Sequence, residues 1–155
     1  MRKLVPLIIL FALTACGSKK ASLSALESTN QQFDGAVAGR DHYSAIYQLD
    51  TDDRETVLKA FRNIKNAMED SRLKGKLKVE LIAFSAGTKV MLKGSIYEAQ
   101  LRDLLQKGVI IAQCNNSLIE QGLGRSQLYP FIALVPSGNG ELIIRNAEGW
   151  AIIKP

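Results

Sequence analysis

Apolar residues beyond about residue 42 follow two patterns, which alternate along the chain. Short continuous apolar runs are typical of buried strands, whereas apolar residues spaced three and four apart are typical of helices that cover a sheet. Strands are predicted over residues 43–49, 77–84, 109–114, 131–135 and 150–154. We therefore expect an α/β fold with three α/β/α layers and a parallel sheet of about five strands.

Polar residues mark where the intervening helices begin. Asp52 is followed three residues later by Glu55, and Ser95 by Glu98, and this spacing is typical of a helix start closed by a capping box. Gly108 follows the second of these helices, as a glycine at a helix end should. Shorter helices are predicted over residues 115–121 and 141–148, and a loop is predicted over residues 136–140.

The first sixteen residues have the pattern of an export signal. Arg2 and Lys3 precede an uncharged apolar stretch, which is shorter than the roughly 20 residues of a membrane-spanning helix. Leu13-Thr14-Ala15-Cys16 resembles the lipobox of bacterial lipoproteins. The resemblance implies a signal peptide over residues 1–15 and a lipid on Cys16. An ordinary secreted protein or a buried N-terminal helix are the alternatives.

Residues 16–41 are rich in serine, glutamine, asparagine and glycine and lack a long apolar pattern. We interpret them as a lipidated tether with a short helix near residues 22–32, and residues 42–155 as the folded domain. Gly17 stands where an aspartate often signals retention at the inner membrane. The sequence therefore favours a cell-envelope protein, lipid-anchored at the outer membrane and facing the periplasm.

Composition narrows the classes of function. Of the 155 residues, 46% are hydrophobic and 23% are charged, which is the mix of a globular protein. His42 is the single histidine, so neither a Ser-His-Asp hydrolase nor a multi-histidine metal site is expected. The net charge is +5, of which Arg2 and Lys3 supply two, and so small a surplus does not indicate a nucleic-acid partner. We expect no cofactor and no metal.

Cys114 is the candidate reactive residue. If a lipid occupies Cys16, Cys114 is the one remaining thiol. It ends a predicted strand and precedes Asn115, Asn116 and Ser117, any of which can cap the next helix. Ligands of open parallel sheets bind at this edge, and the N–H groups of a helix start stabilise a thiolate. The alternative is that Cys114 is a small buried hydrophobe.

A second loop is predicted to lie at the same edge of the sheet. Pro136, Ser137 and Gly138 follow the fourth predicted strand and are candidates for a pocket loop. The loop is either an anion-binding nest or, as the simpler expectation, a plain turn. The sequence has neither a phosphate-binding loop nor the three-glycine dinucleotide fingerprint.

Three segments of the domain resemble the DsrE/DsrF-like family, which includes sulfur-relay subunits. They are residues 63–66, residues 108–118 with Cys114-Asn115-Asn116-Ser117, and residues 128–155 with Val135-Pro136-Ser137-Gly138. The resemblance implies that Cys114 accepts sulfur as a persulfide from a donor and passes it to an acceptor protein. It also implies a homo-oligomer, a trimer or hexamer. Where many relatives carry His-Gly after the second strand, this chain has Phe84-Ser85.

Two hypotheses from different classes follow. In the first, the chain is a membrane-anchored sulfur carrier, similar to a sulfurtransferase, in which Cys114 is the nucleophile and Asn115, Asn116 and Ser117 stabilise its thiolate. In the second, it is a non-catalytic interaction or ligand-binding module on the same fold, and Cys114 is packed.

Overall fold

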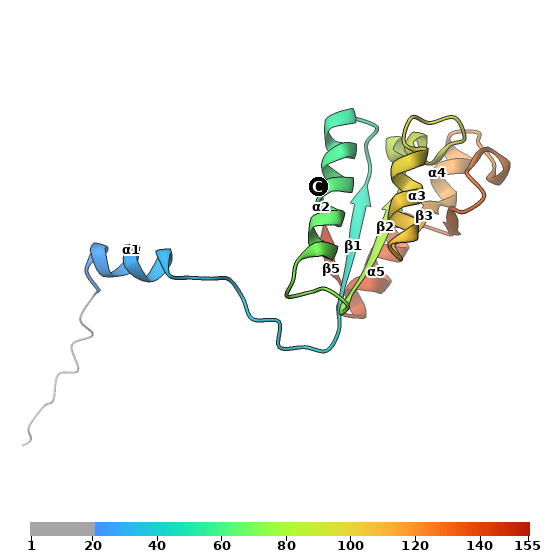
Figure 1. Cartoon of the computed structure of the whole chain (residues 1–155). Helices are drawn as coiled ribbons and strands as arrows, with labels where there is room; N and C mark the ends of the chain where they lie inside the picture. Colours follow the sequence, from blue (N-terminus) through green and yellow to red (C-terminus); the bar gives the residue numbers. More distant parts are fainter. Residues whose placement is uncertain (1–20) are drawn as a thin grey trace, which may run out of the picture. The chain divides into compact units, whose positions relative to one another are not determined.

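A parallel sheet of five strands forms the centre of the domain in the computed structural model, which describes residues 21–155. The strand order is β4-β3-β2-β1-β5, and every adjacent pair is parallel (Figure 1). The strands are β1 (Tyr43–Leu49), β2 (Leu77–Ala83), β3 (Ile110–Cys114), β4 (Ala133–Val135) and β5 (Ala151–Ile153). All five strands lie where the apolar runs predicted them, although β4 and β5 are shorter.

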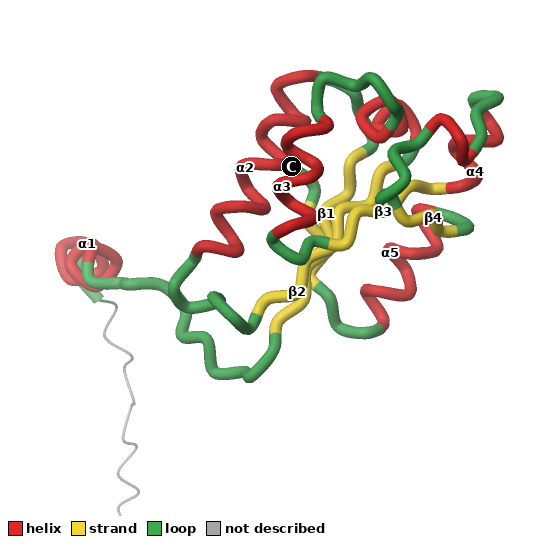
Figure 2. The backbone as a smooth tube through the Cα atoms, turned by 45° about the vertical axis from the view of Figure 1, so that its right-hand side comes forward, coloured by secondary structure: helices red, strands yellow, loops and turns green. Residues whose placement is uncertain are grey.

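The order of the strands explains which helix covers which face of the sheet. From β1 to β4 each connection moves one strand in the same direction, so right-handed crossovers place their helices on one face. The return from β4 to β5 runs the other way, and its helix lies on the opposite face (Figure 2). The first face carries α2 (Arg54–Glu69), α3 (Glu98–Gln106) and α4 (Asn115–Glu120), and the opposite face carries α5 (Gly138–Ala147).

Apolar side chains fill the space on both faces of the sheet. The larger core lies beneath α2, α3 and α4 and includes Leu81, Ile64 and Leu101, all fully buried. The smaller core lies beneath α5 and includes Ile82 and Trp150. Two buried faces confirm the predicted three-layer α/β/α fold, and they explain why the strands are apolar at consecutive positions.

The first domain helix begins one residue later than predicted. Asp53, not Asp52, is the N-cap of α2, and its carboxylate accepts a hydrogen bond of 2.9 Å from the Thr56 amide. Asp52 instead pairs with Lys89 at 2.7 Å. Either aspartate suits the cap, so a partner from a distant part of the chain decides between them.

The predicted capping box at Ser95 is wrong. Residues Ser85–Met91 form a 3-10 helix, η1. The Ser95 hydroxyl donates a 2.8 Å hydrogen bond to the carbonyl of Val90 in η1. The Ser95 hydroxyl is therefore bonded to the preceding 3-10 helix and does not cap α3. The helix α3 begins at Glu98 with no side-chain cap.

The predicted loop over residues 136–140 is also corrected. Ser137 is the N-cap of α5, and its hydroxyl accepts a hydrogen bond of 3.2 Å from the Gly140 amide. The first turn of the helix therefore replaces the predicted plain turn. Two glycines in that turn weaken the sequence signal for a helix, because glycine is a poor helix former.

The chain divides after Ala36, and the first segment contains α1 (Leu23–Gln31), close to the predicted short helix. Ser22 caps this helix, and none of its residues is buried. Among residues 21–155 no helix has the length and apolar character needed to cross a bilayer. The predicted signal peptide, residues 1–15, and the predicted lipid site Cys16 lie outside the described residues.

Candidate functional site

Cys114 occupies the junction between β3 and α4. It is the last residue of the strand and the N-cap of the helix, and its Sγ accepts a hydrogen bond of 3.5 Å from the Ser117 amide. The sequence predicted a cap at Asn115, Asn116 or Ser117, but the sulfur itself takes the place that an aspartate or serine oxygen usually occupies. The side chain of Cys114 is 5% exposed.

Cys114 lines a cavity of about 340 Å³ at the carboxyl edge of the sheet. The segments after β2, β3 and β4 all contribute to it, as expected for a ligand site in a parallel sheet. Of the predicted site residues, the structure brings together Cys114, Asn116, Ser117, Ser137 and Gly138. Asn115 and Pro136 do not line the cavity, although the Pro136 carbonyl accepts a hydrogen bond of 3.4 Å from the Asn116 amide.

Opposing effects act on the thiol of Cys114. Burial raises the pKa of the Cys114 thiol, because an anion is disfavoured away from water. Hydrogen bonds from the Ser117 and Gly138 amides, the Ser117 hydroxyl and the Asn116 amide lower that pKa. Their sum exceeds the effect of burial, so the pKa of Cys114 lies below its ordinary value. The donors come from both α4 and α5.

The segment after β2 closes the cavity from a third side. Ser85 has a φ of 51°, and its amide donates a hydrogen bond of 2.9 Å to the Ser117 hydroxyl. Its carbonyl accepts one of 2.8 Å from the Gln121 side chain. A Cβ on Gly138 would lie 2.9 Å from the ring of Phe84, so glycine lets α5 approach this segment closely. Phe84 and Ser85 thus line the same cavity as the thiol, at the position where many proteins of the DsrE/DsrF-like family carry His-Gly.

Glu120 and Asn139 also line the cavity, and sequence reasoning missed both. Glu120 lies four residues after Asn116 in α4, and this spacing places two residues on one helical face. That spacing was the available signal for Glu120. Asn139 lies in residues 136–140, which were predicted as a loop. A loop has no regular periodicity, so the direction of the Asn139 side chain could not be predicted.

A second buried side chain connects the site to the rest of the fold. Gln113, fully buried, donates hydrogen bonds of 2.9 Å to the Thr88 hydroxyl and to the Cys114 carbonyl. These bonds join η1 to the end of β3. Gln113 is thus a supporting residue, whose side chain lies on the opposite face of β3 from that of its neighbour Cys114, and no pattern in the sequence predicted this role.

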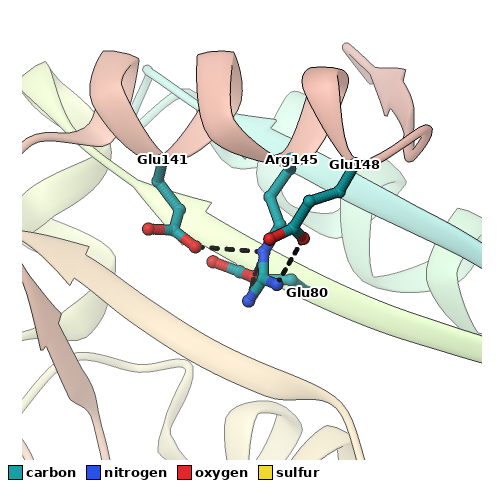
Figure 3. Close-up of polar contacts among 4 residues, drawn as sticks. All are labelled: Glu80, Glu141, Arg145 and Glu148. Carbon is teal, nitrogen blue, oxygen red and sulfur yellow. Dashed lines mark hydrogen bonds and ion pairs between the residues drawn. The ribbon is translucent and has the colours of Figure 1, made fainter.

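A charged cluster fixes α5, which carries Gly138 and Asn139, to the sheet (Figure 3). Arg145 points from α5 toward Glu80 of β2, and the Arg145 Nε donates a hydrogen bond of 2.9 Å to the Glu80 carboxylate. Glu141 and Glu148 of α5 contact the same guanidinium at 3.0 and 3.1 Å. The ring of Trp150 stacks against it at 4.2 Å. Within residues 21–155, no group of three His, Cys, Asp or Glu side chains is placed to hold a metal ion.

Comparison with solved structures places the chain among known folds. MTH1491 of Methanobacterium thermoautotrophicum, a protein of unknown function, is 32% identical and matches with a TM-score of 0.69. The match covers 73% of this chain and 99% of that one. The chain belongs to the family of MTH1491.

A more distant match supports the fold alone. BT1422 of Bacteroides thetaiotaomicron, a conserved protein of unknown function, is similar to this member of the MTH1491 family with a TM-score of 0.61 and 18% identity. The match covers 78% of this chain and 100% of that one. No family model matches the chain, and no curated protein matches it significantly.

Proposed function

We propose that this protein is a sulfur carrier of the DsrE/DsrF-like kind, which holds a persulfide on Cys114. The observation that carries the proposal is a thiol of lowered pKa lining a cavity at the carboxyl edge of a parallel sheet. The thiolate is the nucleophilic form of cysteine, and stabilising it at neutral pH raises the fraction that reacts. Asn116, Ser117 and Gly138 supply the stabilising groups.

The proposed reaction needs no cofactor. The Cys114 thiolate attacks the outer sulfur of a donor persulfide, R–S–SH, and a new sulfur–sulfur bond forms. The bond within the donor breaks, and the donor leaves as its thiolate with the bonding electron pair. Cys114 then carries the outer sulfur with its proton. An acceptor thiolate attacks that sulfur in turn, and the Cys114 thiolate is released unchanged.

The N-terminal pattern adds a location to the proposal. A lipid on Cys16 would anchor the protein in the cell envelope, at the outer membrane and facing the periplasm. Residues 16–41 would then act as the tether of the domain. The donor and the acceptor would be thiols that reach the same compartment.

The proposal also includes assembly into a trimer or hexamer. Ile143 and Ile144 on α5 are 70% and 56% exposed, and exposed apolar residues of this size favour a protein contact.

One observation favours the second hypothesis, a non-catalytic interaction module. Cys114 is only 5% exposed, and free cysteines that are packed in this way are often inert. In that case the exposed isoleucines of α5 would serve assembly alone. The two functions differ in whether the native protein takes up sulfur.

The test uses the mature chain with Cys16→Ser, in which Cys114 is the one thiol. The native protein is incubated with cysteine persulfide, freed of donor, and its intact mass is measured. The proposal expects a gain of one sulfur atom per chain that a reductant removes, and no gain in a second chain that also carries Cys114→Ser. Failure of the native chain to take up sulfur would favour the interaction module.

A further inference from the structure

The charged groups around the cavity suggest which donors it accepts. Glu120 is the one lining side chain of the cavity that carries a formal charge, apart from the Cys114 thiolate. No lysine, arginine or histidine of the described chain lines the cavity. Protein sites for sulfur oxyanions and phosphates usually supply a guanidinium, an ammonium or several free amides. The lining residues therefore lack the cation that such a ligand requires.

Three of the amides near the sulfur do not replace that cation, because they already have acceptors. The Ser117 amide donates to Cys114 Sγ, and the Ser85 amide donates to the Ser117 hydroxyl. On α5, the Gly140 amide donates to the Ser137 hydroxyl. An oxyanion entering the cavity would lose its water and would meet no cation among the lining residues, which is unfavourable.

Glu120 adds a repulsive charge at this position. It is exposed, and it makes no ion pair with any residue in the described part of the chain. Its carboxylate therefore adds an unpaired negative group to the wall of the cavity that Cys114 also lines. Like charges within about 8 Å in water repel measurably, and the repulsion weakens as salt is added.

We infer that the cavity selects sulfur donors by charge and that Glu120 is the specificity-determining residue. Donors that are neutral or cationic around the reacting sulfur are accepted, and the oxyanions of sulfur, such as thiosulfate, are disfavoured. This inference rests on the proposed function, because it concerns the donor that loads Cys114. It excludes a class of small inorganic donor and favours a sulfane sulfur carried on an organic thiol.

The test compares alkyl methanethiosulfonates that share one reacting group and differ only in the charge of the alkyl chain. Each forms a disulfide with the thiolate and releases methanesulfinate, so the chemistry is constant across the series. The probes carry a trimethylammonium, a hydroxyl or a sulfonate group, and the protein is the native Cys16→Ser chain. Rates are followed by intact mass at low and at high salt.

We expect the cationic probe to react faster than the neutral one, and the neutral faster than the anionic. The thiolate contributes to this order in every variant, so the informative quantity is the change caused by Glu120→Gln. Removing the Glu120 charge should reduce the cation-to-anion rate ratio by roughly two- to fivefold, the order expected for one unit charge acting through water. Added salt should reduce the same ratio in the Cys16→Ser chain that keeps Glu120. Glu55→Gln, at an exposed acid of α2 away from this cavity, should leave the ratio unchanged.

The outcomes separate the inference from the proposed function. Reaction of all three probes with a ratio that Glu120→Gln does not change would overturn the charge selection and leave the sulfur carrier standing. Faster loading by thiosulfate than by cysteine persulfide would do the same. A native thiol that reacts with no probe would overturn the proposed function and the inference with it.

Discussion

The side chain of Glu80 shows how a single buried charge is held in this fold. Glu80 lies in the middle of β2 and is 1% exposed. Burial raises the pKa of its carboxyl, and the nearby Glu141 also raises it, whereas Arg145 and Lys78 act in the opposite direction. Burial has the largest effect, so the net pKa of Glu80 is raised above 4.5. A charged Glu80 thus lowers stability relative to the neutral carboxyl.

The pH dependence of stability tests this charge directly. The folded state binds the Glu80 proton more tightly than the unfolded state does, so this carboxyl lowers stability as the pH rises through its raised pKa. Glu80→Gln removes the charge and leaves Arg145 its contacts with Glu141 and Glu148. At pH 7 we expect the variant to be more stable in urea unfolding, because the cost of burying the Glu80 charge exceeds its attraction to Arg145 and Lys78. The difference should shrink as the pH falls toward 4.5, and a less stable variant at pH 7 would show that the ion pair dominates.

Among the elements, the apolar pattern predicted the strands well because the three central strands, β1, β2 and β3, are buried on both faces. Residues 77–83 include Lys78 and Glu80, but their apolar residues occupy both alternate sets of positions, as in a strand covered on two sides. The starts of helices were predicted less well, since local sequence offers several caps and distant partners choose among them. Lys89 pairs with Asp52 and leaves Asp53 to cap α2.

The candidate site was only partly predicted, because local sequence shows where Cys114 lies along the chain but not which distant segments surround it. The position of Cys114 at the end of a strand followed from the pattern of β3 alone. That its sulfur would be the helix cap, and that Phe84 and Glu120 would line the same cavity, depended on how three segments meet in space. The start of α5 was not predicted, because glycines such as Gly138 and Gly140 are typical of loops. Only the structure shows that Gly138 is packed against Phe84.

The close approach of α5 to Phe84 leads to a prediction for Gly138→Ala. A Cβ at this position would lie 2.9 Å from the Phe84 ring, so either the ring or the start of α5 must move. We expect a loss of about 1–3 kcal/mol in the free energy of unfolding and a higher pKa for Cys114, because the Gly138 amide would be displaced from the sulfur.

Gly140→Ala is the matched control. It lies in the same turn, and its Cβ would meet only Ser137, at 3.3 Å. We expect a smaller change in stability and little change in the reactivity of Cys114. Equal effects of the two substitutions would mean that the contact with Phe84 does not position the start of α5.

In the whole molecule, we assign the proposed chemistry to the folded domain and the proposed membrane attachment to the N-terminal segment. The domain from Val37 to Pro155 contains the sheet and the cavity, and the segment before it contains one short exposed helix within residues 21–36. The lipid proposed on Cys16 would place the domain at a membrane. Thiols in that compartment, not cytoplasmic ones, would be its partners.

Detergent partitioning tests the proposed anchor. The mature protein from a bacterial host should enter the detergent phase of a temperature-induced Triton X-114 separation, because two or more acyl chains give stable membrane attachment. Cys16→Ser should leave the protein unlipidated, either as an unprocessed precursor or in the aqueous phase. A mature unsubstituted chain in the aqueous phase would contradict the anchor, although it would leave the chemistry of Cys114 untouched.

Whether Cys114 is a stabilised thiolate in the native protein is tested by the pH profile of its alkylation. The native Cys16→Ser chain is treated with iodoacetamide over a pH series, and the rate is measured by intact mass. We expect a half-maximal rate at a pH below about 8.5, the ordinary pKa of a cysteine thiol, and an upward shift in Ser117→Ala, which lacks the hydroxyl that stabilises the anion. A thiol that is alkylated only after denaturation, or a profile centred at or above about 8.5, would contradict a stabilised Cys114 thiolate.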